Sequence, residues 1–72
     1  MERYIGHHPL LKALVLQYDA EIARALANIA VYTDHPAGIG EHPDLVEAVD
    51  TQVQALANAD EKLKTLKEYY DI

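Results

Sequence analysis

The stretch PLLKALVLQYDAEIARALANIAVYT, residues 9–33, decides the fold of this chain. Apolar residues recur along it at alternating intervals of about four and three positions, the heptad pattern of an α-helix that packs along one face. His8 followed by Pro9 marks its start, because proline is pre-set for the first helical position and needs no N–H partner there. The residues of this first seam are Leu11, Val15, Tyr18, Ile22, Ala25, Ile29 and Tyr32.

A second seam keeps the same alternation on another face of this helix. It consists of Leu16, Ala20, Ala23, Ala27 and Ala30. Most of these side chains are small, which would let a neighbouring backbone come close. A two-helix hairpin covers only one stripe of each helix. We therefore expect the first seam to pack on a second helix of the same chain and the second seam to pack on another protomer.

The first helix is predicted to end at Thr33. Asp34, His35 and Pro36 interrupt it, because the residue before a proline avoids the α region and proline itself cannot continue the hydrogen-bond ladder. Residues 34–42 then form a loop, in which Gly38 and Gly40 allow positive φ values.

The second predicted helix covers residues 43–70. Its start has two interpretations: Pro43 is the first helical residue, or Asp44 caps the helix with Glu47 in a capping box. Its seam is Leu45, Val49, Gln52, Leu56, Ala59, Leu63, Leu66 and Tyr70. Polar residues gather on the opposite side, which we expect to face solvent. The prediction is an all-α protein, an antiparallel two-helix hairpin that assembles into a homo-oligomeric helical bundle.

Length and composition also favour self-association. The 72 residues form one predicted domain, with an arm at residues 1–8. One core of this size supplies only about 3 to 5 kcal/mol. The sequence has no Cys, which excludes disulfides and thiolate metal sites as additional sources of stability. Oligomerisation is the remaining common source.

The charge and hydropathy of the chain restrict its partners and location. A formal net charge of −6 repels nucleic-acid backbones and anionic membrane surfaces. No signal-peptide pattern opens the chain, and no apolar run approaches the roughly 20 residues that a bilayer requires. We expect a cytoplasmic protein without nucleic-acid or membrane partners.

We predict no catalytic residue, no metal and no cofactor. The chain has no Ser or Cys nucleophile. Glu47 and Asp50 have the spacing of a magnesium pair, as in all-α nucleotide pyrophosphohydrolases, but both fall on the polar face of the second helix. The histidines lack the helical spacing of metal ligands and mostly precede a proline or open a helix.

The most distinctive segment is the turn GIGEHP at residues 38–43. Its glycines expose backbone amides just before a helix N-terminus, where the amides and the helix dipole favour an anion. An alternative is purely structural: the glycines make the turn and Asp44 caps the helix. In an antiparallel dimer the arm of one chain could reach the turn of the other. The candidate ligand-binding residues are Gly38, Ile39, Gly40, Glu41 and His42 on one wall and Arg3, Tyr4, His7 and His8 on the other.

The segments HHPLLKALVLQYDAEIA, PAGIGEHPDLVEAVD and ADEKLKTLKEYY resemble a set of short helical-hairpin proteins of tailed, T4-like bacteriophages. The hairpin architecture and the Pro36–Gly38 turn are more loosely similar to the phage sponges that sequester nucleotide signals of bacterial immunity, the anti-CBASS and anti-Thoeris proteins. This second resemblance implies a small, homo-oligomeric, non-enzymatic protein in the cytoplasm of an infected host, which binds a phosphate-bearing nucleotide signal between protomers.

The sequence therefore favours two candidate functions. The first is a non-enzymatic phage protein that captures a small nucleotide-like immune signal. The second is a structural, assembly or host-protein-docking hairpin that has no small-molecule ligand. Binding of a nucleotide would distinguish them.

Overall fold

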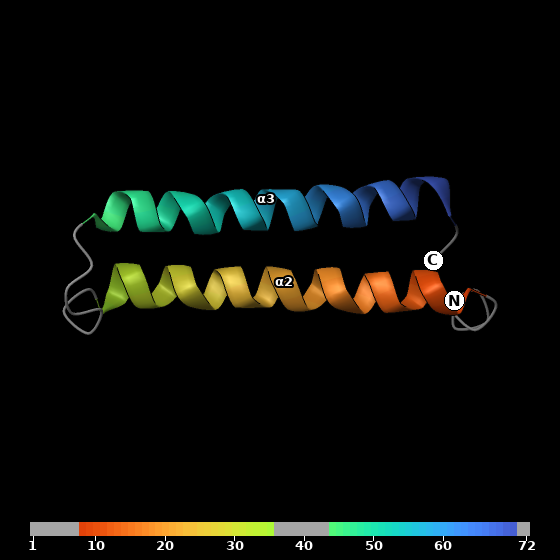
Figure 1. The fold of residues 1–72 in the computed structure, drawn as a ribbon, viewed down its shortest axis with the longest axis horizontal. Helices are drawn as coiled ribbons and strands as arrows, with labels where there is room; N and C mark the ends of the chain where they lie inside the picture. Colours follow the sequence, from red (N-terminus) through yellow and green to blue (C-terminus); the bar gives the residue numbers. More distant parts are fainter. Residues whose placement is uncertain (1–7, 36–43, 71–72) are drawn as a thin grey trace.

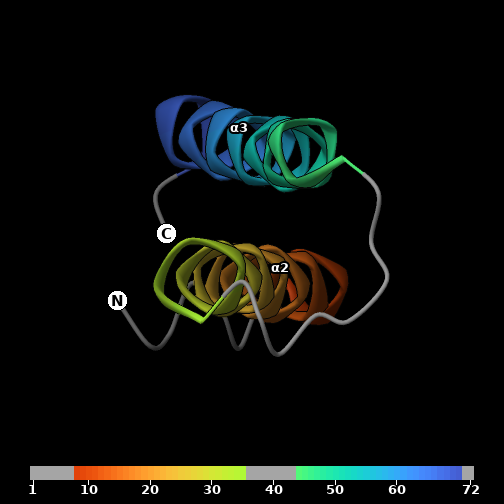
Figure 2. The same cartoon turned by 90° about the vertical axis from the view of Figure 1, so that its left-hand side faces the viewer.

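A computed structural model describes residues 8–35 and 44–70. They form two helices, α2 (Pro9–Asp34) and α3 (Leu45–Tyr69), which run antiparallel and side by side (Figure 1). Viewed along the helices, the two lie in a single layer (Figure 2). The hairpin is a thin rod, with extents of 47 × 17 × 16 Å. The predicted all-helical hairpin is confirmed.

The first seam of α2 faces α3, as predicted. Each of its residues is buried or half-buried, and so is the α3 seam from Leu45 to Leu66. Tyr70 was wrongly assigned to that seam, because it lies at the C-cap with φ −132° and ψ 139° and remains 49% exposed. An extended backbone no longer follows the helical period, so its side chain leaves the stripe.

The fully buried part of the interface is small. Ala25 and Ala59 are each 1% exposed, Ala48 is 7% exposed and Tyr18 is 9% exposed. Burial of alanines in a two-helix contact requires the opposing backbone to come close. The larger aliphatic side chains of the seams stay half-exposed, because one helix cannot enclose them. Among the described residues no polar or charged side chain is buried.

The start of α3 decides between the two interpretations of the sequence. Asp44 has an extended backbone, and its Oδ1 accepts a hydrogen bond from the N–H of Glu47 at 2.9 Å. Asp44 is therefore the N-cap, and the helix begins at Leu45 instead of residue 43. This bond satisfies one of the N–H groups that a helix start leaves without an intrahelical partner.

The end of α2 lies one residue beyond the predicted Thr33, at Asp34. His35 is the C-cap, and its N–H donates to the carbonyl oxygen of Val31 at 2.9 Å. The Thr33 hydroxyl donates to the carbonyl oxygen of Ile29 at 2.8 Å. Thr33 therefore joins the last turn of the helix before Pro36 interrupts it.

Removal of the α3 cap should destabilise the hairpin. Asp44→Ala deletes the acceptor for the Glu47 N–H, and loss of such a cap costs about 1 kcal/mol. We expect a lower midpoint in urea unfolding followed by circular dichroism at fixed protein concentration. Asp50→Ala removes the same charge from an exposed position within α3 and is the control. Equal midpoints for the two variants would contradict the capping role.

Enlarging a contact alanine should also destabilise the hairpin. Ala59→Leu inserts a larger side chain where the residue is 1% exposed, and overpacking costs about 1 to 3 kcal/mol. Ala57→Leu makes the same change at an exposed position two residues earlier and should cost little. Thermal unfolding of both variants tests whether the backbones of α2 and α3 come close at Ala59. An Ala59→Leu variant as stable as the parent chain would refute this close contact.

Candidate functional site

The structure describes one of the predicted ligand-binding residues. Within the described part lies His8, the N-cap of α2, which is exposed and makes no side-chain capping bond. The other predicted residues lie outside the described residues: Arg3, Tyr4, His7, Gly38, Ile39, Gly40, Glu41 and His42.

Chain length keeps the two predicted walls apart within one chain. The 26 residues of α2 span about 39 Å. The five residues from His8 back to Arg3 span at most about 18 Å, and the four from Asp44 back to Gly40 at most about 14 Å. The combined length of these two extended segments is shorter than α2. Extended backbone alone therefore does not join the arm to the turn within one chain, which favours a site shared with a second chain.

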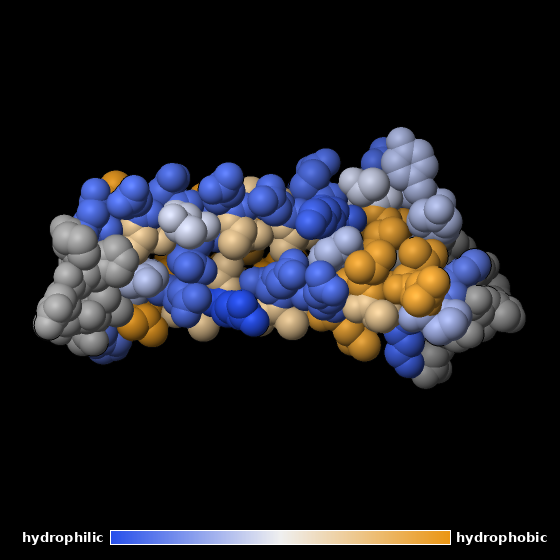
Figure 3. Space-filling model, in the orientation of Figure 1, coloured by the Kyte–Doolittle hydropathy of each residue, from blue (hydrophilic) through white to orange (hydrophobic). Residues whose placement is uncertain are grey.

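Among the described residues, the surroundings of His8 are apolar. A surface hollow of about 400 Å³ is lined by His8, Pro9, Leu10, Leu11 and Tyr70. Leu10 is 82% exposed. Hydrophobic side chains gather at this end of the face shown in Figure 3, whereas polar side chains cover most of the rest of that face. A charge that recognises an anion here must come from the arm or from another chain.

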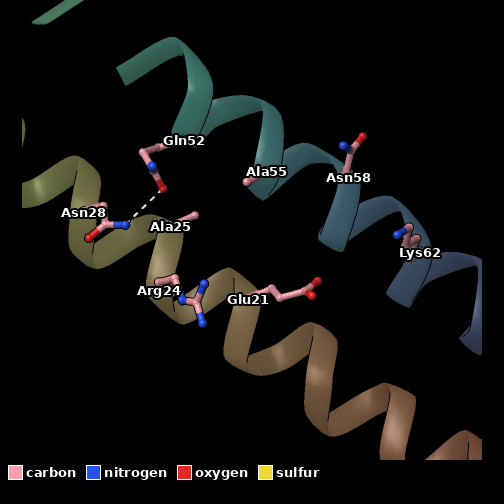
Figure 4. A pocket seen from close by; sticks show the side chains of 8 residues that line it. All are labelled: Glu21, Arg24, Ala25, Asn28, Gln52, Ala55, Asn58 and Lys62. Carbon is pink, nitrogen blue, oxygen red and sulfur yellow. Dashed lines mark hydrogen bonds between the residues drawn. The ribbon is translucent and has the colours of Figure 1, made fainter. Parts of the chain in front are cut away.

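A polar groove half-way along the hairpin was missed by the sequence analysis. It has a volume of about 420 Å³, within the usual range of small-molecule sites. Figure 4 shows that its walls come from both helices. The lining residues are Glu21, Arg24, Ala25 and Asn28 of α2 and Gln52, Ala55, Asn58 and Lys62 of α3.

One side-chain hydrogen bond crosses this groove from helix to helix. Asn28 Nδ2 donates to Gln52 Oε1 at 3.1 Å (Figure 4). Lys62 Nζ lies 5.7 Å from the centroid of the Tyr18 ring, within range of a cation–π contact. Neither Arg24 nor Lys62 has a salt bridge to a carboxylate within the described residues. The groove therefore offers two cationic side chains, three amide side chains that can donate and accept, and one carboxylate, Glu21.

The sequence contained only a weak signal for this groove. Gln52 occupies a seam position that is otherwise apolar, and such a polar residue is commonly paired. Asn28 and Glu21 immediately precede seam residues of α2. Both are half-buried in the structure. Their positions in the sequence did not indicate whether they face the groove or the solvent.

An apolar groove lies near the loop end of the hairpin. It has a volume of about 450 Å³ and includes Val46 and Val53, which are 81% and 46% exposed. The other lining residues are Tyr32, Thr33, Leu45, Val49 and Asp50. This groove holds no constellation of polar groups that would orient a reacting substrate. It is a surface for apolar contact.

Residues 8–35 and 44–70 contain no group of three or more His, Cys, Asp or Glu side chains placed to hold a metal ion. Glu47 and Asp50, the carboxylate pair noted in the sequence, are exposed on α3. Neither described helix is long and apolar enough to cross a bilayer. A comparison of the chain with protein-family models, curated proteins and solved structures finds no match.

Removal of metal should leave the hairpin unchanged. The histidine spacing predicts no metal site, so a chelator has no ion to remove. We expect the same melting temperature with and without an excess of EDTA, measured by circular dichroism. A stoichiometric metal in the purified protein, together with a lower melting temperature after chelation, would overturn this prediction.

Proposed function

We propose that this chain is a non-enzymatic binding protein that works as a homo-oligomeric helical bundle and holds a small, phosphate-bearing nucleotide between protomers. The observation that carries the proposal is the separation of the two predicted walls by the full length of α2. A site made of arm and turn is then most simply shared by two chains, so assembly and ligand binding become parts of one function.

The exposed face of α2 supports the assembly. The second seam is exposed along its whole length, although it repeats the heptad spacing of the seam that packs on α3. Leu16 is 58% exposed and Leu26 is 52% exposed. Isolated apolar side chains are common on protein surfaces, but a continuous apolar stripe on an otherwise charged chain is typical of an interaction site.

The chemistry at the turn supports an anionic ligand that is bound with help from a second chain. The turn leads into the N-terminus of α3, where unpaired N–H groups and the helix dipole favour negative charge. Asp44 already places a carboxylate there and uses the Glu47 N–H. A phosphate therefore needs added positive charge, which Arg3 of another protomer supplies in this proposal.

The setting of this function rests on the resemblance of the sequence to phage hairpins. A sponge that removes an immune signal needs binding without turnover, which agrees with a site of amides, one arginine and imidazoles. In this proposal the chain acts in the cytoplasm of an infected bacterium and intercepts a nucleotide signal.

The apolar groove at the loop end favours a second candidate function. Val46 and Val53 are exposed there beside Tyr32, which suits an apolar segment of a host or phage protein. In that case the chain is a docking hairpin without a small-molecule ligand. The two candidates differ in whether any nucleotide raises the stability of the protein.

Charge placed in the second seam should disrupt the assembly. We expect the parent chain to sediment as an oligomer and the double variant Ala23→Glu, Ala27→Glu to be monomeric or unfolded, because unpaired charges in a close contact cost several kcal/mol. Asn58→Glu with Thr65→Glu adds the same charge to an exposed side of α3 and should leave the oligomer intact. A parent chain that sediments as a folded monomer would refute self-association.

Ligand binding should appear as a thermal shift against a panel of cyclic and linear nucleotides. At a concentration of 100 times its dissociation constant, a ligand adds about 2.7 kcal/mol to native stability. Arg3→Ala should remove a charge-assisted contact worth about 1.5 to 3 kcal/mol and leave the melting temperature without ligand unchanged.

Gly40→Val should abolish binding by crowding the approach to the turn amides. Its helix content and oligomer size must match those of the parent chain for this loss to be informative. If no nucleotide in the panel shifts the parent chain, the sponge function is wrong and the docking function takes its place.

A further inference from the structure

The exposed large hydrophobic side chains of α2 are confined to one side of it. Within the described part of α2 these are Leu10, Leu16, Leu26 and Val31, which are 82%, 58%, 52% and 46% exposed. Leu16 belongs to the second seam, and the other three lie directly beside it in the heptad. Ala13, also exposed, extends the seam by one step toward the N-terminus. This face is therefore bordered by large side chains and has small ones along most of its centre.

We infer that this face of α2 packs antiparallel on the same face of a second copy, centred between Ala20 and Ala23. This inference rests on the proposed self-association and adds its geometry. Ala20 then faces Ala23 of the second copy, and Ala13 faces Ala30 of the second copy. Leu16 faces Ala27 of the second copy, and each of these contacts occurs twice because the pair is symmetric.

The sizes of the seam residues favour this arrangement over a parallel one. Leu16 is the single large side chain within a seam of alanines. In the antiparallel pair it lies opposite an alanine in both copies, so the helices can stay evenly close. In a parallel pair it meets its own copy, which separates the helices at that layer and leaves the alanine layers underpacked. Beside the seam, the antiparallel pair also brings Leu10 next to Val31 of the second copy.

Charge distinguishes the arrangements less strongly than size does. The exposed ends of this face carry Lys12 and Asp34. Antiparallel packing brings these opposite charges together at both ends, whereas parallel packing places each beside its own copy. A parallel pair would instead form two surface ion pairs between Asp19 and Arg24. Exposed ion pairs are each worth about 0 to 1 kcal/mol, so the ion pairs of the antiparallel arrangement and those of the parallel arrangement contribute nearly the same stability. The packing of the seam residues therefore decides between the two arrangements.

The same register connects the interface with the candidate site. The centre between Ala20 and Ala23 is also the midpoint of α2, so the two helices overlap from Pro9 to Asp34. His8 of one chain then lies level with His35 of the second copy. His8 is the described residue nearest to the arm and His35 is the one nearest to the turn, so this register brings the points where the two segments join α2 to the same level. Because the pair is symmetric, this arrangement of His8 and His35 occurs at both ends of the pair.

Disulfide trapping tests the register, because the chain has no Cys of its own. Ala13→Cys and Ala30→Cys are prepared separately, one of them with a nitrogen-15 label, mixed to allow exchange of chains, and oxidised. We expect dimers that link residue 13 to residue 30, well above the proportion that random pairing gives. Linked peptides are identified by mass spectrometry. Ala57→Cys on the exposed side of α3 measures background oxidation.

The other outcomes overturn the inference. Links of 13 to 13 and 30 to 30 would show a parallel pair. No links above the background would show that this face is not the interface, provided that circular dichroism shows both variants folded. Sedimentation of the parent chain separates these results from failure of the proposed function. If the parent chain is an oligomer but its seam cannot be cross-linked, self-association is supported and the antiparallel register is wrong.

Discussion

A helix that meets one antiparallel neighbour can bury only one stripe of its surface, and α2 carries two. Its first seam uses α3, and nothing within the described chain covers the second. This mismatch explains why a sequence rich in apolar residues produces a rod with few buried side chains. It also separates the roles of the helices, because α3 has a charged outer side whereas the outer side of α2 is mostly alanine and leucine. In the proposed bundle α2 would therefore be the inner helix.

The contact between α2 and α3 combines close approach with one polar pair. Ala25 and Ala59 allow the backbones to come near, and the Asn28–Gln52 hydrogen bond lies beside this region. The alanine contacts themselves select the register, since a shift by one heptad would bring Tyr18 or Tyr32 to the place of Ala25. A shift would also break the hydrogen bond between Asn28 and Gln52, because Glu21 or His35 would then take the place of Asn28. A polar residue in a heptad seam can specify register in this way, at some cost in stability.

Much of the fold was predictable because heptad spacing and proline positions act locally. The first seam of α2, the solvated side of α3 and the interruption near Pro36 follow from the sequence. Tyr70 was misplaced because periodicity does not reveal where a helix frays. The start of α3 remained open because Pro43 and Asp44 are both good starting residues, and only the observed bond from Glu47 N–H decides for the cap. The polar groove was missed because it depends on how residues of two helices face each other, which one helical pattern does not contain.

The division of the candidate site between the ends of α2 has a consequence for how the proposed function would be regulated. In the proposed antiparallel pair each end would combine the arm of one chain with the turn of the other, so a single chain would have no complete site and a pair would have two. A ligand that bridges the chains then stabilises the pair as well as being bound by it, since whatever binds only the assembled state shifts the equilibrium toward that state. The apparent affinity would rise with protein concentration. Binding at one end would favour binding at the other, because the first ligand contributes to the free energy of assembly that the second also requires.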